Sequence, residues 1–164
     1  MAMQTDVKSF HVMAGTPTSV GTDRTRLKGA VVSNTSSGTP ANILFANNVS
    51  ISATYNIPGS AVCTVTVAGG HGLVTNNRVF LNFTSGSAVD NVYTVTVTGA
   101  TTFTVATAVL TTSGNVDIYA RSLMEIDITN SVPVCVTIPG EGILASDGIF
   151  VGVPANIAAT VFYG

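Results

Sequence analysis

The chain has 164 residues, a length that allows one domain of ordinary size or two very small ones. Charged residues make up only 9% of it, against roughly 25% in a typical soluble domain. The formal net charge of -2 argues against a nucleic-acid binder, which normally carries a basic excess. So few charges predict that partner subunits cover much of the surface.

The N-terminal segment, residues 1–26, shows no clear periodicity. Polar residues dominate it, and Gly15, Pro17 and Gly21 interrupt any pattern. Glycine and proline are the strongest local breakers of regular structure. We therefore expect an extended N-terminal arm with little core of its own.

After residue 26 the chain alternates apolar and polar residues with a period of two, and helical periodicity is absent. Glycine, asparagine, proline and serine separate the alternating runs, which predicts short strands. In residues 61–119 the texture changes to alternating Thr and Val in five short runs. The strands outside that segment are predicted at 27–34, 42–46, 49–57, 122–130, 132–139, 149–153 and 159–164, with a break at 58–60 and a turn-rich hairpin at 140–148.

The predicted fold class is all-β. Residues 27–60 plus 120–164 are expected to form an antiparallel, jelly-roll-like β-sandwich. Residues 61–119 are expected to form a small β-barrel module inserted at a surface turn of that sandwich.

The stretch "AGGHGLVTNNRVF", residues 68–80, places His71 between glycines and resembles an active-site loop at first sight. A catalytic histidine needs a nearby nucleophile and an orienting acid, and neither stands beside it. The neighbouring Thr75 and Asn76 are turn residues. No phosphate-loop lysine follows, and strands flank the loop. The pattern favours a hairpin turn with no catalytic role.

Glu125 and Asp127 in "MEIDIT" would point to the same face of a strand. Paired carboxylates can do acid–base chemistry or bind calcium. A polar outer face opposite Met124, Ile126 and Ile128 explains them equally well, and this interpretation is favoured. We predict no catalytic site, no metal site and no cofactor.

A single basic cluster, Arg24, Arg26 and Lys28, gives a candidate interaction site. At alternating positions these residues could share one strand face and contact an acidic neighbour. The alternative, which is favoured, is a solvated edge of the first strand.

The two cysteines, Cys63 and Cys135, both lie in alternating apolar runs. There a free cysteine acts as a small hydrophobe, so both are predicted to be buried and reduced, with a disulfide as the less favoured alternative. The N-terminus lacks the apolar run of a signal peptide, and no run of about 18 apolar residues exists. We expect a soluble, non-secreted protein without a membrane segment.

Two resemblances follow from longer motifs. "GHGLVTNNRVFLNFTSGS" with "DNVYTVTVTGATTFTVATA" resembles a module of tailed-phage virion proteins. The module is similar to the first catalytic-cysteine half-domain of ubiquitin-activating enzymes. In phage proteins it is a structural unit, so the resemblance transfers no catalytic role to Cys63.

The outer parts, "RTRLKGAVVSNTSSGT" and "IPGEGILASDGIFVGVPANIAATVFYG", resemble small virion proteins of phages that infect cyanobacteria and other marine bacteria. The resemblances imply a non-enzymatic virion protein, assembled in the bacterial cytoplasm. A capsid decoration (cement) protein is the first expectation. It would be a homo-oligomer, with a trimer favoured, bound to the major capsid protein. A tail or neck component is the alternative, ahead of a host-receptor or carbohydrate-binding module.

Overall fold

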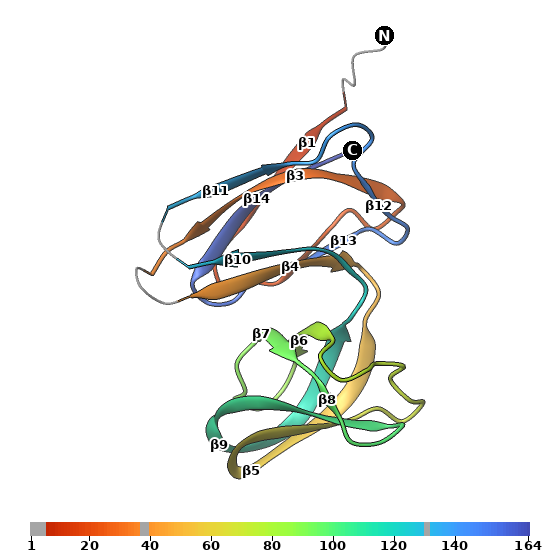
Figure 1. The fold of residues 1–164 in the computed structure, drawn as a ribbon, viewed down its shortest axis with the longest axis vertical. Helices are drawn as coiled ribbons and strands as arrows, with labels where there is room; N and C mark the ends of the chain where they lie inside the picture. Colours follow the sequence, from red (N-terminus) through yellow and green to blue (C-terminus); the bar gives the residue numbers. More distant parts are fainter. Residues whose placement is uncertain (1–5, 37–39, 130–131) are drawn as a thin grey trace. The chain divides into compact units, whose positions relative to one another are not determined.

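The computed structural model describes residues 6–36, 40–129 and 132–164, and this part of the chain contains strands but no helix (Figure 1). The all-β prediction is confirmed, with three antiparallel sheets. The chain divides into two compact units. Unit 1 combines Met1–Asn48 with Leu123–Gly164, and unit 2 is Val49–Ser122.

Unit 1 contains nine of the strands, in two sheets. Sheet A has the strand order β1-β14-β3-β11, with β12 also paired to β3. Sheet B has the order β10-β4-β13-β2. The strands are β1 (Lys8–Val12), β2 (Thr18–Val20), β3 (Thr25–Asn34), β4 (Ala41–Asn47), β10 (Ser122–Ile128), β11 (Val134–Thr137), β12 (Ile143–Ala145), β13 (Ile149–Gly152) and β14 (Ile157–Tyr163).

The core of unit 1 lies between sheets A and B, which gives the unit a sandwich-like architecture (Figure 1). In β3, Ala30 and Val32 are buried in this core, while Val31 between them is only half-buried on the other face. The residues that alternate in the sequence therefore lie on opposite faces of the strand, one buried and one outward. Phe45 of β4 and Ile149 of β13 enter the same core from sheet B.

Residues 6–26 differ from the predicted extended arm, whose first five residues lie outside the described part of the chain. β1 pairs with β14 along Lys8–Val12, and β2 pairs with β13. Val12 and Val20 end these two strands and are 1% and 2% exposed. One buried valine in each short strand packs the strand against the core. A single apolar residue among polar ones does not produce the alternation from which a strand is predicted.

Unit 2 is a five-stranded sheet, sheet C, in the order β5-β9-β6-β7 with β8 also paired to β9. No closed barrel is detected in the described part of the chain. The unit has its own core, which includes Ile57, Val65, Leu81 and Phe103. Its strands are β5 (Ile51–Thr66), β6 (Arg78–Phe83), β7 (Asn91–Thr94), β8 (Thr96–Val97) and β9 (Thr102–Tyr119).

The predicted break at 58–60 is wrong, because β5 continues through it. Residues 49–57, expected in the sandwich, supply the first part of β5, which pairs with β9 in unit 2. The register shifts between Pro58 and Ser60 and again between Ser60 and Val62. β5 is an edge strand, where a proline and a bulge are tolerated.

β9 is also longer than predicted, since it runs through Gly114 instead of ending near it. A Cβ at Gly114 would collide with the Ser85 side chain and lie 2.7 Å from the Ser85 carbonyl oxygen. Ser85 Oγ accepts a hydrogen bond from the Asn115 amide at 2.7 Å, and its carbonyl accepts one from the Tyr55 hydroxyl at 2.9 Å. This glycine therefore allows the loop after β6 to approach the paired strands β5 and β9.

Candidate interaction surface

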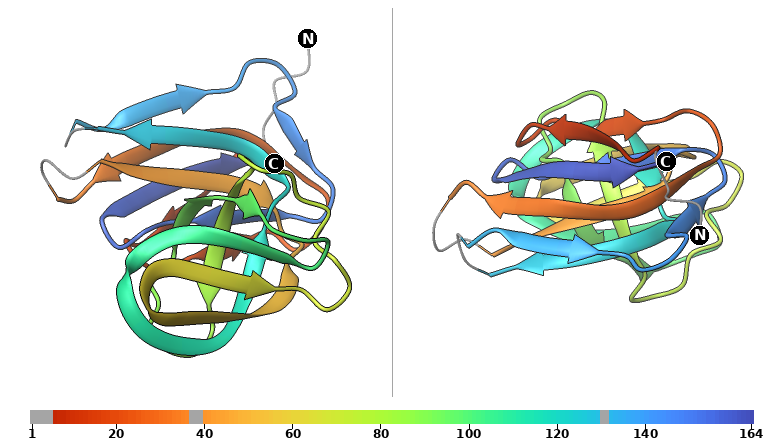
Figure 2. Two further views of the ribbon diagram at one scale, coloured as in Figure 1. Left: turned by 60° about the horizontal axis from the view of Figure 1, so that its bottom comes forward. Right: turned by 90° about the horizontal axis from the view of Figure 1, so that it is seen from above.

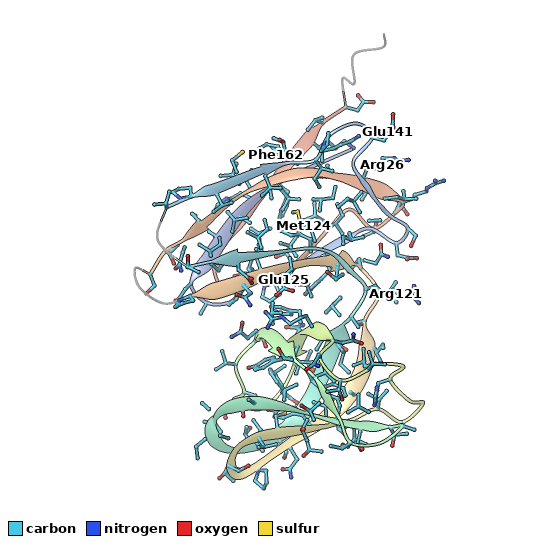
Figure 3. All side chains as sticks on the ribbon, in the orientation of Figure 1. Arg26, Arg121, Met124, Glu125, Glu141 and Phe162 are labelled. Atoms are coloured by element: carbon cyan, nitrogen blue, oxygen red, sulfur yellow. The ribbon has the colours of Figure 1, made fainter. Side chains whose placement is uncertain are left out.

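The three residues of the basic cluster do not form one exposed face. Arg24 lies before β3 and is exposed, whereas Arg26 lies on β3 and its Nε is 3.8 Å from Glu141 Oε2. Figure 3 shows Arg26 and Glu141 near each other at one end of sheet A. The acidic neighbour of Arg26 is thus a residue of the same chain, in a pair open to water.

Lys28 is 9% exposed, and its Nζ donates a hydrogen bond to the Glu141 carbonyl oxygen at 2.6 Å. The next residue, Gly142, has φ +81 and lies so close to Leu27 that a Cβ there would collide with the Leu27 carbonyl. Lys28 therefore holds the loop between β11 and β12 against β3. The glycine beside Glu141 predicts a turn, but the sequence alone does not show that Lys28 binds to this turn.

Glu125 and Asp127 share the outward face of β10, as the alternation predicts. Ile126 and Ile128 are buried in the core, and Met124 packs against it between the two sheets (Figure 3). Asn42 Nδ2 donates to Glu125 Oε1 at 3.5 Å. Within residues 6–36, 40–129 and 132–164, no group of three or more His, Cys, Asp or Glu is arranged to hold a metal ion.

His71 is 6% exposed and joins two turns of unit 2. Its Nε2 donates to the Gly99 carbonyl at 2.9 Å, and its Nδ1 accepts from the Leu73 amide at 3.0 Å. The ring also meets Phe103 edge-on, with centroids 5.4 Å apart. Both ring nitrogens are used inside the fold, so this histidine is a structural residue of the turn.

The two cysteines differ in their surroundings, although both are free. The prediction is confirmed for Cys63, which is buried, and burial raises the pKa of its thiol to about 11. It is wrong for Cys135, which is exposed. Cys135 lies opposite Val31, on the outward face of sheet A, so the alternation of β11 has the opposite phase to the one assumed.

Unit 2 has a cavity of about 330 Å³ beside the loop that precedes β7. Its lining includes Ile57, Leu110, Asn91 and Tyr93, and no charged side chain. The Tyr93 hydroxyl donates to the Val89 carbonyl at 2.6 Å. Burial, with smaller contributions from Cys63 and Asp90, raises the pKa of Tyr93 to about 12. That hydroxyl is engaged within the fold and stays protonated at neutral pH.

The outward face of sheet A carries an uncharged surface that the strand register defines. It alternates with core positions such as Val12, Ala30 and Val161. Several of its side chains, including Phe162 and Val31, are half-buried, and Cys135 and Thr137 are exposed. Two rows cross the four main strands: Ser9, Phe162, Gly29 and Thr137 in one, and His11, Thr160, Val31 and Cys135 in the other.

This face has the composition of a contact surface between proteins. None of the residues in these two rows is an acid, a lysine or an arginine, and the centres of protein interfaces are depleted in charge. The low charge of the sequence predicts a covered surface but does not locate it. The location of this surface depends on the pairing of β1, β14, β3 and β11. This pairing brings strands from both ends of the chain into one sheet.

No family model matches the sequence, and a search of curated proteins finds no match. Among the described residues, no helix has the length and apolar character needed to cross a membrane.

Proposed function

We propose that the protein is a non-enzymatic structural component of a tailed-phage virion, and within the virion a capsid decoration protein. The observation that carries the proposal is the uncharged outward face of sheet A. Such a face fits a protein that works by binding neighbouring subunits. Burial of apolar surface stabilises such a contact by about 25 cal/mol per Å². The resemblances to virion proteins, which cover most of residues 24–164, point in the same direction.

In this proposal the protein is a homo-oligomer, first of all a trimer, bound to the major capsid protein. Assembly takes place in the bacterial cytoplasm, and no cofactor takes part. Attachment depends on sheet A instead of an unpaired N-terminal arm, because β1 and β2 are paired within unit 1.

The finer fold that we propose is a jelly-roll-like sandwich for unit 1 and a barrel-like module for unit 2. The pairing of unit 2 supports the second part. Only Val95 separates β7 from β8; β7 pairs with β6, while β8 pairs with the N-terminal part of β9. β6 pairs with the C-terminal part of β9, so the sheet curls back on its own longest strand.

The test of the location is the copy number of the chain in purified virions, measured from a stained gel against the major capsid protein. We expect hundreds of copies, as decoration of a capsid lattice requires. A dozen or so copies would support the alternative of a tail or neck component. Absence from the particle would overturn both.

The test of the surface is a double substitution, Cys135→Glu with Thr137→Glu, in rebinding to capsids stripped of the protein. Both side chains are exposed, so the fold should tolerate the charges. We expect at least a tenfold loss of binding. The matched control is Thr111→Glu, an exposed strand position in unit 2. An equal loss in the control, or no loss in the double variant, would contradict the assignment of sheet A.

A further inference from the structure

Sheet A ends at β1, an edge strand. One side of β1 pairs with β14, and its other side has no strand partner in the described part of the chain. Figure 2 shows β1 at the margin of this sheet. An exposed edge presents backbone N–H and C=O groups that can pair with a strand of another chain.

The other edges of unit 1 carry features that discourage pairing. β2 has only three residues, and β10 carries Glu125 and Asp127. β11 has four residues and lies between Pro133 and Pro139. Short strands, charges and prolines are the usual protection of a sheet edge. β1 has five residues, no proline and a single charge, that of Lys8.

Apolar side chains gather along the same edge. Val7 is 50% exposed, Phe10 41% and Met13 64%. They make up three of the nine large apolar side chains that the described residues expose. An exposed apolar edge strand is a pairing site, and a second strand laid against it would cover these side chains.

We propose that two copies of the chain pair antiparallel through β1, about a two-fold axis at Phe10. In this register Phe10 lies opposite the partner's Phe10, Val7 opposite the partner's Met13, and Ser9 opposite the partner's His11. In these pairs apolar residues face apolar residues and polar residues face polar ones, which is the pairing that stabilises neighbouring strands. All five residues of β1 are paired, and each copy contributes the same surface, as a two-fold contact requires.

The charges select this register. Lys8 faces the partner's Val12 and Asp6 faces the partner's Ala14, so no like charges meet. An axis at Lys8 would place two lysines directly opposite each other, which is unfavourable. Axes at Ser9 or His11 would place Val7 opposite the partner's His11, or Met13 opposite the partner's Ser9. The contact does not depend on the virion role, and in a trimeric assembly it would join one trimer to the next.

The register is tested by disulfide cross-linking in a Cys135→Ser background, in the full chain under mild oxidation. We expect Phe10→Cys to form covalent dimers, because directly opposite Cβ atoms lie about 4.5–5.5 Å apart, close to disulfide reach. Ser9→Cys and His11→Cys should cross-link when mixed and not separately. Thr137→Cys, exposed on the opposite edge of sheet A, is the control. Cross-linking of Phe10→Cys no faster than the control overturns the proposal.

The contact itself is tested by mass in solution, from light scattering. We expect an even number of chains in the wild-type assembly and half that mass for Ser9→Lys, with unchanged circular dichroism. Thr111→Lys, at an exposed strand position in unit 2, should keep the wild-type mass. A wild-type assembly with an odd number of chains, a monomer included, overturns the proposal.

Discussion

Unit 1 draws its sheets from two separate segments of the chain, whereas unit 2 is built from one continuous segment. In sheet A, Lys8 lies opposite Tyr163 and Ile157 opposite Asn34, so unit 1 forms only when both ends of the chain meet. All strand pairs of unit 2 lie within β5–β9. Closing a longer loop costs more chain entropy, so unit 2 should fold first and independently, and unit 1 should depend on strands from both termini.

The largest effect should come from deleting residues 1–20, which removes β1 and β2. The deletion exposes two edges of unit 1 and takes Val12 and Val20 out of its core. We expect unit 1 to lose its cooperative fold while the amides of unit 2 stay protected from hydrogen exchange. Deletion of residues 1–7 leaves both strands in place and is the control. Retained protection in sheets A and B after the larger deletion would contradict this dependence on the N-terminus.

The next effect comes from two matched core truncations, Phe45→Ala in unit 1 and Phe103→Ala in unit 2. Both side chains are fully buried, and each substitution should cost about 3–5 kcal/mol. Hydrogen exchange measured by mass spectrometry should show the loss of protection in the substituted unit alone. Equal losses in both units for either variant would mean that the two cores unfold together.

A smaller effect is expected for Gly114→Ala, where the new methyl group would push Ser85 away from β9. The cost should be about 1–3 kcal/mol and confined to unit 2. Gly69→Ala is the matched control, because nothing lies within 4 Å of the position that its Cβ would take. Urea unfolding of both variants measures the difference. If the two cost the same, the close approach of Ser85 is not what requires glycine at position 114.

The smallest effect concerns Asp90. Burial raises the pKa of its carboxyl group above the ordinary value of 3.8, although the hydrogen bond from the Phe83 amide acts to lower it. The folded chain then binds this proton more tightly than the unfolded chain, so the contribution to stability is present in acid and is lost as the pH rises through the folded pKa. In Asp90→Asn the side-chain oxygen can still accept the hydrogen bond from the Phe83 amide, but the side chain no longer titrates. Its stability relative to the wild type should therefore increase from about pH 4 to pH 7, measured by urea unfolding. A difference that does not change with pH would show that Asp90 does not contribute this proton linkage.

The alternation of the sequence was enough to predict the all-β class and most strands, since β3, β4, β10 and β14 begin and end near the predicted residues. It could not show which glycines break a strand. Gly114 lies inside β9 because Ser85 approaches it, and Gly59 lies inside β5 at a bulge with φ 74. Both roles depend on a neighbouring segment, which periodicity along one strand does not contain.

The candidate surface was less accessible from sequence. Low charge indicated covered surface, but the uncharged face exists only after β1, β14, β3 and β11 are placed side by side. Lys28 shows the same limit in another form. Its residue type suggested an exposed contact, whereas its amine is used by the carbonyl of Glu141, more than a hundred residues away along the chain.

The contrast between the two thiols makes Cys135 a natural place for a chemical reporter. Cys63 is buried with a pKa of about 11, so a maleimide dye at neutral pH should react with the exposed Cys135 alone. The dye would then sit on the uncharged face of sheet A without any engineered residue. Protection of that thiol on intact particles, and its return after gentle stripping, would report occupancy of the face directly.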